Sequence, residues 1–209
     1  MKILFSSFTP NDLRVFARLD SPAKIQVFLD NMPYSAEERY RCPRSVLQDR
    51  VAHCYDGALF AAAALRRLGH APLIIDMLAH NDDDHLLALF KRGGHWGAVA
   101  KSNFVGLRYR EPIYRTVREL AMSYFEDFYN VAREKTLRSY TVPLNLKAFD
   151  KQDWMTRDET MDVIADKLES MRQVVVITRE MAARLQPVDK RSFEAGLMGS
   201  NAAGLFKPK

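Results

Sequence analysis

The chain is poor in cysteine, with only Cys42 and Cys54 among its 209 residues. A fold stapled by disulfides needs more pairs than this, and a zinc site built from thiolates needs more ligands. The composition therefore excludes both kinds of framework. Free thiols are typical of a reducing compartment, where they are available for chemistry.

Long apolar runs are also missing. No stretch of about 18 apolar residues occurs, which is the length that spans a bilayer. The segment MKILFSSFTP has a short apolar part followed by Pro10, too short for a secretion signal. We therefore expect no membrane partner and a cytoplasmic location.

A strong excess of one charge is absent. The 31 basic and 26 acidic residues give a net charge of +5, and they are interspersed rather than gathered in a basic tail. A solvated helix face accounts for the arginines from Arg108 to Arg118, so we do not expect nucleic acid as a partner. Apolar residues make up 47% of the chain, enough for the core of one globular domain.

What is present predicts an α+β fold. Thr9-Pro10 and Ser21-Pro22 are typical starts of two short helices. From Cys54 apolar residues recur at steps of three and four, which predicts a helix that stops at Gly69. The next segments predict a strand over 71–79 and a β-hairpin that begins at His85, turns at Gly93-Gly94 and closes at Asn103.

The second half has a weaker pattern. Its expected elements are an amphipathic helix over 113–130, an extended segment over 139–149, one or two helices over 156–186 that start at a Thr156–Glu159 capping box, and an irregular end over 192–209. We expect a division near residue 112, between a core of residues 1–112 and a mainly helical extension of residues 113–209.

Cys54 is the first candidate for chemistry. A cysteine at a helix N-terminus is shifted toward the thiolate by unpaired N–H groups and the helix dipole. His85 opens the following hairpin and could act as base, with Asn103 orienting its ring as the third member of a catalytic triad. The alternative is that Cys54 is simply a core residue, since free cysteine is often buried.

The order of these features resembles the transglutaminase-like superfamily, which shares the papain-like core of cysteine peptidases. The features are a cysteine that opens a helix ending in Leu-Gly-x-x-Pro, a strand, a strand that starts with histidine and a glycine-containing hairpin, and they cover residues 22–106. The resemblance implies a core in which a helix packs on a small antiparallel sheet. It also implies Cys54 as nucleophile, His85 as base and Asn103, or its neighbour Ser102, as the orienting group.

Gln48 lies six residues before Cys54, a spacing that resembles the oxyanion-hole glutamine of papain-like enzymes. The alternative for Gln48 is a surface position in a helix. Together these residues imply an enzyme that cleaves or transfers an acyl group from an amide, with a peptide or small amide as substrate and no cofactor. A binding or scaffold protein that keeps this fold without turnover is the other interpretation.

Two further histidine patterns offer alternatives. His95, in the hairpin turn, is the alternative base to His85. Asp82, Asp83 and Asp84 stand between His80 and His85 and could be interpreted as a metal site. Three consecutive carboxylates point in different directions, so we expect a solvated turn and no metal.

Overall fold

The computed structural model describes residues 7–208, and it is a mixed fold of helices with one antiparallel sheet, which confirms the α+β prediction. Six strands lie in the order β4-β3-β2-β1-β5-β7, and β6 pairs with β1 beside them. The strands are β1 Leu73–Ala79, β2 His85–Arg92, β3 His95–Val99, β4 Arg110–Tyr114, β5 Leu137–Thr141, β6 Leu144–Asn145 and β7 Gln173–Val175.

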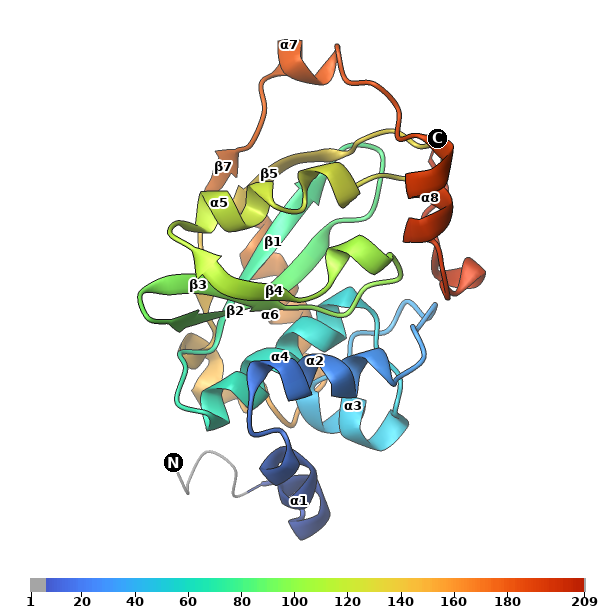
Figure 1. The fold of residues 1–209 in the computed structure, drawn as a ribbon. Coiled ribbons are helices and arrows are strands. Elements are labelled where there is room, and N and C mark those ends of the chain that lie inside the picture. The colour runs from blue at the N-terminus through green and yellow to red at the C-terminus, as the bar shows by residue number, and fades with distance from the viewer. Residues whose placement is uncertain (1–6, 209) are drawn as a thin grey trace.

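The helices lie on both faces and at both ends of this sheet (Figure 1). The α-helices are α1 Pro10–Arg18, α2 Pro22–Asp30, α3 Pro43–Asp49, α4 Cys54–Arg67, α5 Val117–Met122, α6 Glu159–Glu169, α7 Arg179–Ala182 and α8 Lys190–Gly196. The short 3₁₀ helices are η2 Val105–Leu107, η3 Phe125–Asp127, η4 Leu146–Gln152 and η5 Ala202–Gly204. Within residues 7–208, every helix is too short or too polar to cross a membrane.

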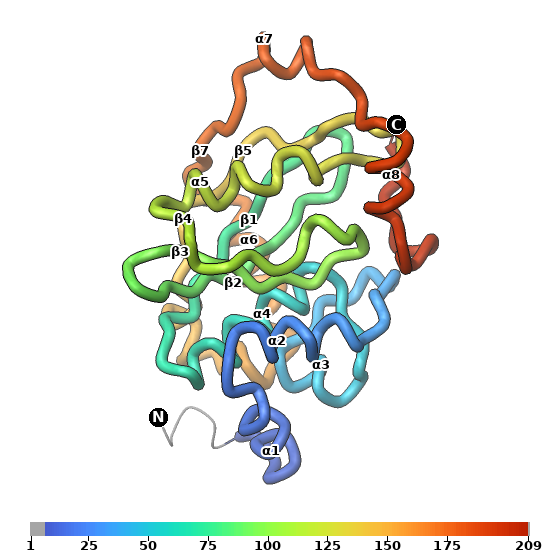
Figure 2. Tube along the Cα trace, in the orientation of Figure 1, coloured from blue at the N-terminus to red at the C-terminus, as the bar shows by residue number. Residues whose placement is uncertain are grey.

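Both faces of the sheet are buried, which explains why β2 reads as a continuous apolar run. Side chains that alternate along the strands divide into two clusters. Leu86 and Ala88 face α4, whereas Leu87 and Leu89 face the segment of α5 and η3. Figure 2 traces the chain through these layers, with α1 and α7 at opposite ends of the molecule.

Helix α4 lies at the centre of the first cluster, between the sheet and helices α2 and α3. Every residue from Tyr55 to Leu65 is buried, and a helix surrounded by protein on all sides is apolar around its whole circumference. Its alanines permit this close packing. Gly57 is required where α4 approaches the sheet, because a Cβ there would lie 2.2 Å from Cβ of Lys101.

Local signals in the first half are confirmed, except that the second strand of the hairpin, β3, ends at Val99 rather than at Asn103. The side chains of Thr9 and Ser21 cap α1 and α2, and Gly69 ends α4 with a φ of 93°. The hairpin turns at Gly93 and Gly94, with φ values of 56° and 84°. Positive φ at both central residues is the geometry of a tight hairpin turn, which glycine adopts without strain.

Predictions for the second half are partly wrong. The helix expected over 113–130 is interrupted: β4 reaches Tyr114, and α5 is short, because the aromatic residues here cover the sheet. The capping box is absent, since Thr156 Oγ1 donates to the Asp153 carbonyl and α6 begins after Asp158 without a side-chain cap. The segment expected to be irregular overlaps α8, which starts at Lys190.

The division expected near residue 112 falls inside β4. Strand β5 pairs with the central strand β1, and β7 pairs with β5. The second half thus supplies strands to the sheet as well as helices, and it helps to hold the strands that carry the candidate site.

Candidate functional site

A network of hydrogen bonds fixes the N-terminus of α4, where Cys54 lies. His53 is the N-cap, and its ring accepts the Tyr55 N–H at 3.2 Å. The Asp56 carboxylate accepts the His53 N–H at 3.3 Å and the Arg41 N–H at 2.7 Å, and it lies 3.6 Å from the Arg41 guanidinium. This reciprocal capping holds Cys54 as the first residue of the helix.

The Cys54 thiol contacts the start of β2. Its Sγ donates to the Asp84 carbonyl at 3.7 Å. The Leu86 backbone and the Tyr34 hydroxyl also lie close enough to the sulfur to influence its pKa. The thiol is therefore held against the backbone on either side of His85, and it remains half-buried rather than enclosed.

The resting form of Cys54 is the thiol. The pKa of Cys54 is raised to about 12, mainly by burial and then by the carboxylates of Asp76 and Asp83, while Tyr34 and the Leu86 backbone oppose this rise. A thiolate was expected from the helix N-terminus alone. Burial and nearby carboxylates outweigh that effect here, because both disfavour a negative charge on the sulfur.

His85 is a buried, neutral imidazole at the first position of β2. Burial lowers its pKa to about 4. One ring nitrogen, Nε2, lies 2.7 Å from the Leu107 carbonyl oxygen. A carbonyl can only accept, so Nε2 carries the proton and Nδ1 is left as an acceptor.

Leu107 holds the ring in the way that was predicted for Asn103. The Asn103 amide is paired elsewhere: its Nδ2 donates to the Asn201 carbonyl at 2.8 Å, and its Oδ1 accepts the Asn201 N–H at 2.7 Å. Ser102 Oγ accepts the Phe104 N–H. Neither side chain is hydrogen-bonded to His85 among residues 7–208.

Cys54 and His85 share a cavity without a direct hydrogen bond between them in the described structure. The His85 ring lies edge-on to Phe128, which belongs to the sheet face opposite α4. Both residues nevertheless line a cavity of about 40 Å³ at the end of β2. A cavity of that size has room for a water molecule.

Gln48 and His95 lie away from this cavity. Gln48 is exposed on α3, and neither residue is among the side chains that line the cavities at Cys54. His95 Nδ1 pairs with the Gly93 carbonyl inside the hairpin turn. The role predicted for Gln48 stays a prediction without a supporting contact, and His85 is the better placed of the two histidines.

A larger cavity of about 440 Å³ opens in front of Cys54. Tyr34 and Asp76 line it, and neither was singled out from the sequence. Asp76 was detectable, as the one charged residue in the strand LIIDMLA. Tyr34 had no comparable signal, because it is brought beside the start of α4 by a backbone bridge to Ala52, which is distant in sequence.

The acidic triplet at the end of β1 serves mainly to shape a turn. Asp82 accepts from the Thr136 hydroxyl at 2.7 Å, and Asp84 accepts from the Ala79 N–H at 2.7 Å. Across residues 7–208, no three histidine, cysteine or acidic side chains are grouped so as to hold a metal ion. Asp83 and Asp84 instead face the cavity in front of Cys54.

The C-terminal strap, residues 198–206, closes one side of the site. Asn201 Nδ2 donates to the Tyr34 carbonyl at 2.9 Å, in addition to its pairing with Asn103. Gly204 packs on the Tyr34 ring, where a Cβ would lie 2.9 Å from the ring. Phe206 lines both cavities with Cys54, so the strap forms part of their walls.

Comparison with known proteins adds no relative: no protein-family model matches the chain, and no curated protein matches it.

Proposed function

We propose that the chain is a transglutaminase-like cysteine enzyme that breaks an amide through an acyl-enzyme on Cys54. One observation carries the proposal. A half-buried thiol at the first residue of a buried helix opens into a substrate-sized cavity, and the neutral imidazole of His85, whose Nδ1 is left as an acceptor, lines a small cavity that Cys54 also lines. Nucleophile and base are the two groups that acyl transfer requires.

The protonation states of the two groups suit base-assisted attack. With a high pKa for Cys54 and a low pKa for His85, the resting pair is neutral. The thiol proton would pass to Nδ1 of His85, through a water in the 40 Å³ cavity, as sulfur attacks the carbonyl carbon. The imidazolium then protonates the leaving amine, and the C–N bond breaks to leave a thioester.

Donors for the oxyanion are already present at the sulfur. The Tyr34 hydroxyl and the Leu86 N–H lie near it, and they would stabilise negative charge on the carbonyl oxygen in place of Gln48. Water then attacks the thioester with His85 as base and releases an acid. An amine as the attacking group would give acyl transfer instead.

A burst of p-nitrophenol release from p-nitrophenyl acetate tests the proposal. The reference is a peptide with the sequence of residues 51–60, which carries the same cysteine unfolded. A buried thiol of pKa about 12 is less ionised near neutral pH than that peptide. Acylation of Cys54 faster than the peptide therefore requires a base, and we expect it, together with slow turnover.

Two variants assign the roles. Cys54→Ser should abolish the acetyl adduct at this site, and Cys42, which is buried, should remain unmodified. His85→Ala should slow acylation by about 10²-fold or more, the usual contribution of a general base. If the folded wild type acylates no faster than the peptide, the chain is a binding protein rather than an enzyme. If His85→Ala acylates at the wild-type rate, His85 is not the base.

A further inference from the structure

The cavity in front of Cys54 has an unusual charge. Six acidic residues line it, and its described lining contains no lysine or arginine: Glu37, Glu38, Asp76, Asp83, Asp84 and Glu169. The chain as a whole carries a net charge of +5. The negative field at this cavity is therefore a local property, opposite in sign to the average surface, and it favours cationic ligands.

Among these six residues, Asp76 has a buried carboxylate oxygen, Oδ1, without a hydrogen-bond donor in the described structure. The backbone N–H of Asp76 donates to Thr141, but its side chain faces the cavity shared with Cys54. Buried polar atoms are nearly always paired, so an unpaired carboxylate oxygen at a cavity wall is an open acceptor for a donor on a bound molecule.

Aromatic rings in the lining of the same cavity distinguish an organic cation from a metal ion. The rings of Tyr40 and Tyr55 are stacked with centroids 4.4 Å apart, and His53 lies edge-on to Tyr40. Aromatic faces attract ammonium and guanidinium groups. With about 440 Å³, the cavity is large enough for an amino-acid-sized substituent.

We propose that this cavity binds a protonated amine carried by the acyl substrate, with Asp76 as its main partner. The proposal rests on the proposed function for the part the amine plays in the reaction. A cation beside Asp76 would offset the negative charges that disfavour ionisation of Cys54. Cys54 must ionise before its sulfur attacks the carbonyl, so the cation has to be bound by then. The amine therefore belongs to the substrate that acylates the enzyme, not to a later acceptor.

Charged thiol reagents test the cavity independently of catalysis. Aminoethyl and sulfonatoethyl methanethiosulfonate have similar sizes and opposite charges, and each forms a mixed disulfide with a thiolate and releases methanesulfinate. The ratio of their rates at Cys54 is divided by the same ratio for the unfolded peptide of residues 51–60. We expect this normalised ratio to exceed about 10, as a nearby carboxylate implies.

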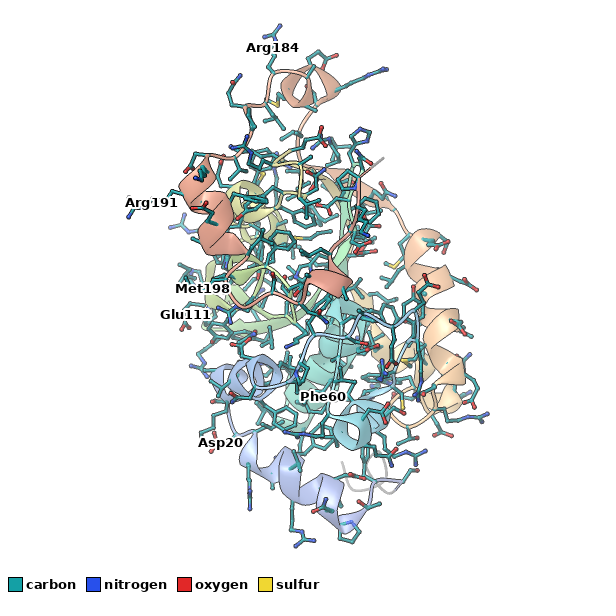
Figure 3. The ribbon with its side chains drawn as sticks, turned by 90° about the vertical axis from the view of Figure 1, so that its right-hand side faces the viewer. Asp20, Phe60, Glu111, Arg184, Arg191 and Met198 are labelled. Carbon is teal, nitrogen blue, oxygen red and sulfur yellow. The ribbon has the colours of Figure 1, made fainter. Side chains whose placement is uncertain are left out.

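Matched variants locate the preference. Asp76→Asn should reduce the normalised ratio by about tenfold, and Glu169→Gln should reduce it less, because Glu169 is exposed. Asp20→Asn is the control for net charge, since Asp20 is exposed just beyond the end of α1 (Figure 3) and does not line the cavity. A normalised ratio of one or below in the wild type overturns the proposal, as does a ratio that neither Asp76→Asn nor Glu169→Gln changes.

Two matched esters connect the cavity to the reaction. The p-nitrophenyl esters of N-acetyl-lysine and N-acetyl-norleucine differ in side-chain charge at nearly equal size. We expect the lysine ester to acylate Cys54 about tenfold faster, and Asp76→Asn to remove that advantage. A reagent preference without any acylation would refute the proposed function and leave the amine site standing. Equal acylation by the two esters would refute the amine site and leave the enzyme standing.

Discussion

Replacing Asp76 by asparagine should stabilise the protein, and by an amount that depends on pH. Burial raises the pKa of Asp76 to about 7 from its ordinary value of 3.8, and the carboxylates of Asp84 and Glu169 add to this rise. The folded state therefore binds the proton more tightly than the unfolded chain. As the pH rises from about 4 to about 7, the unfolded chain gains from ionisation that the folded state resists, so this group lowers stability across that window.

The size of the effect follows from the shift. About three pKa units at about 1.36 kcal/mol each give an upper value of about 4 kcal/mol. Because Asp76 is only half-buried, solvent screening reduces this to about 2 kcal/mol. An asparagine amide that finds no partner would cost about 1 kcal/mol in return. We expect Asp76→Asn to be more stable than the wild type by about 1 to 2 kcal/mol above neutral pH.

Urea unfolding followed by tryptophan fluorescence measures this at several pH values, with Trp154 as a buried reporter. The low pKa values of His53 and His85 also make stability depend on pH, but they act in both proteins. The difference between variant and wild type isolates Asp76. It should be small near pH 4 and grow as pH rises. A difference that stays constant with pH, or a variant less stable at neutral pH, would show that the folded state does not disfavour the ionised form of Asp76.

The parts of the fold that sequence predicted well depend on local interactions. Thr9 and Ser21 cap helices within three residues of themselves, and Gly93-Gly94 closes a hairpin between adjacent strands. The helix from Cys54 was predictable because every one of its turns is apolar. His85 was correctly placed at the start of β2 because a short apolar run follows it directly.

Partners that are distant in sequence could not be predicted in this way. Asn103 was assigned to His85, but it pairs with Asn201, 98 residues later, and no local pattern indicates such a contact. A backbone carbonyl, that of Leu107, orients His85 instead, and main-chain groups leave no residue-type signal. The concentration of acidic residues at the cavity could not be predicted from the sequence either, because these residues come from four separate segments of the chain.

Two further changes test how the site is held. Gly57→Ala should destabilise the protein by about 1 to 3 kcal/mol in thermal unfolding, because the added Cβ meets Lys101. The higher helix propensity of alanine alone would stabilise the protein by about 1 kcal/mol, so the sign of the change decides between the two effects. Removal of residues 199–209 takes away Asn201 and Phe206, which bind and cover the walls at Cys54. Since burial is the main cause of the high pKa of Cys54, opening the cavity should lower that pKa and raise the rate of iodoacetamide labelling by about tenfold per pKa unit near neutral pH. Asn201→Ala, which loosens the strap without removing it, should give a smaller increase. Equal labelling of the full chain and the truncated chain would mean that the strap does not control access to the thiol.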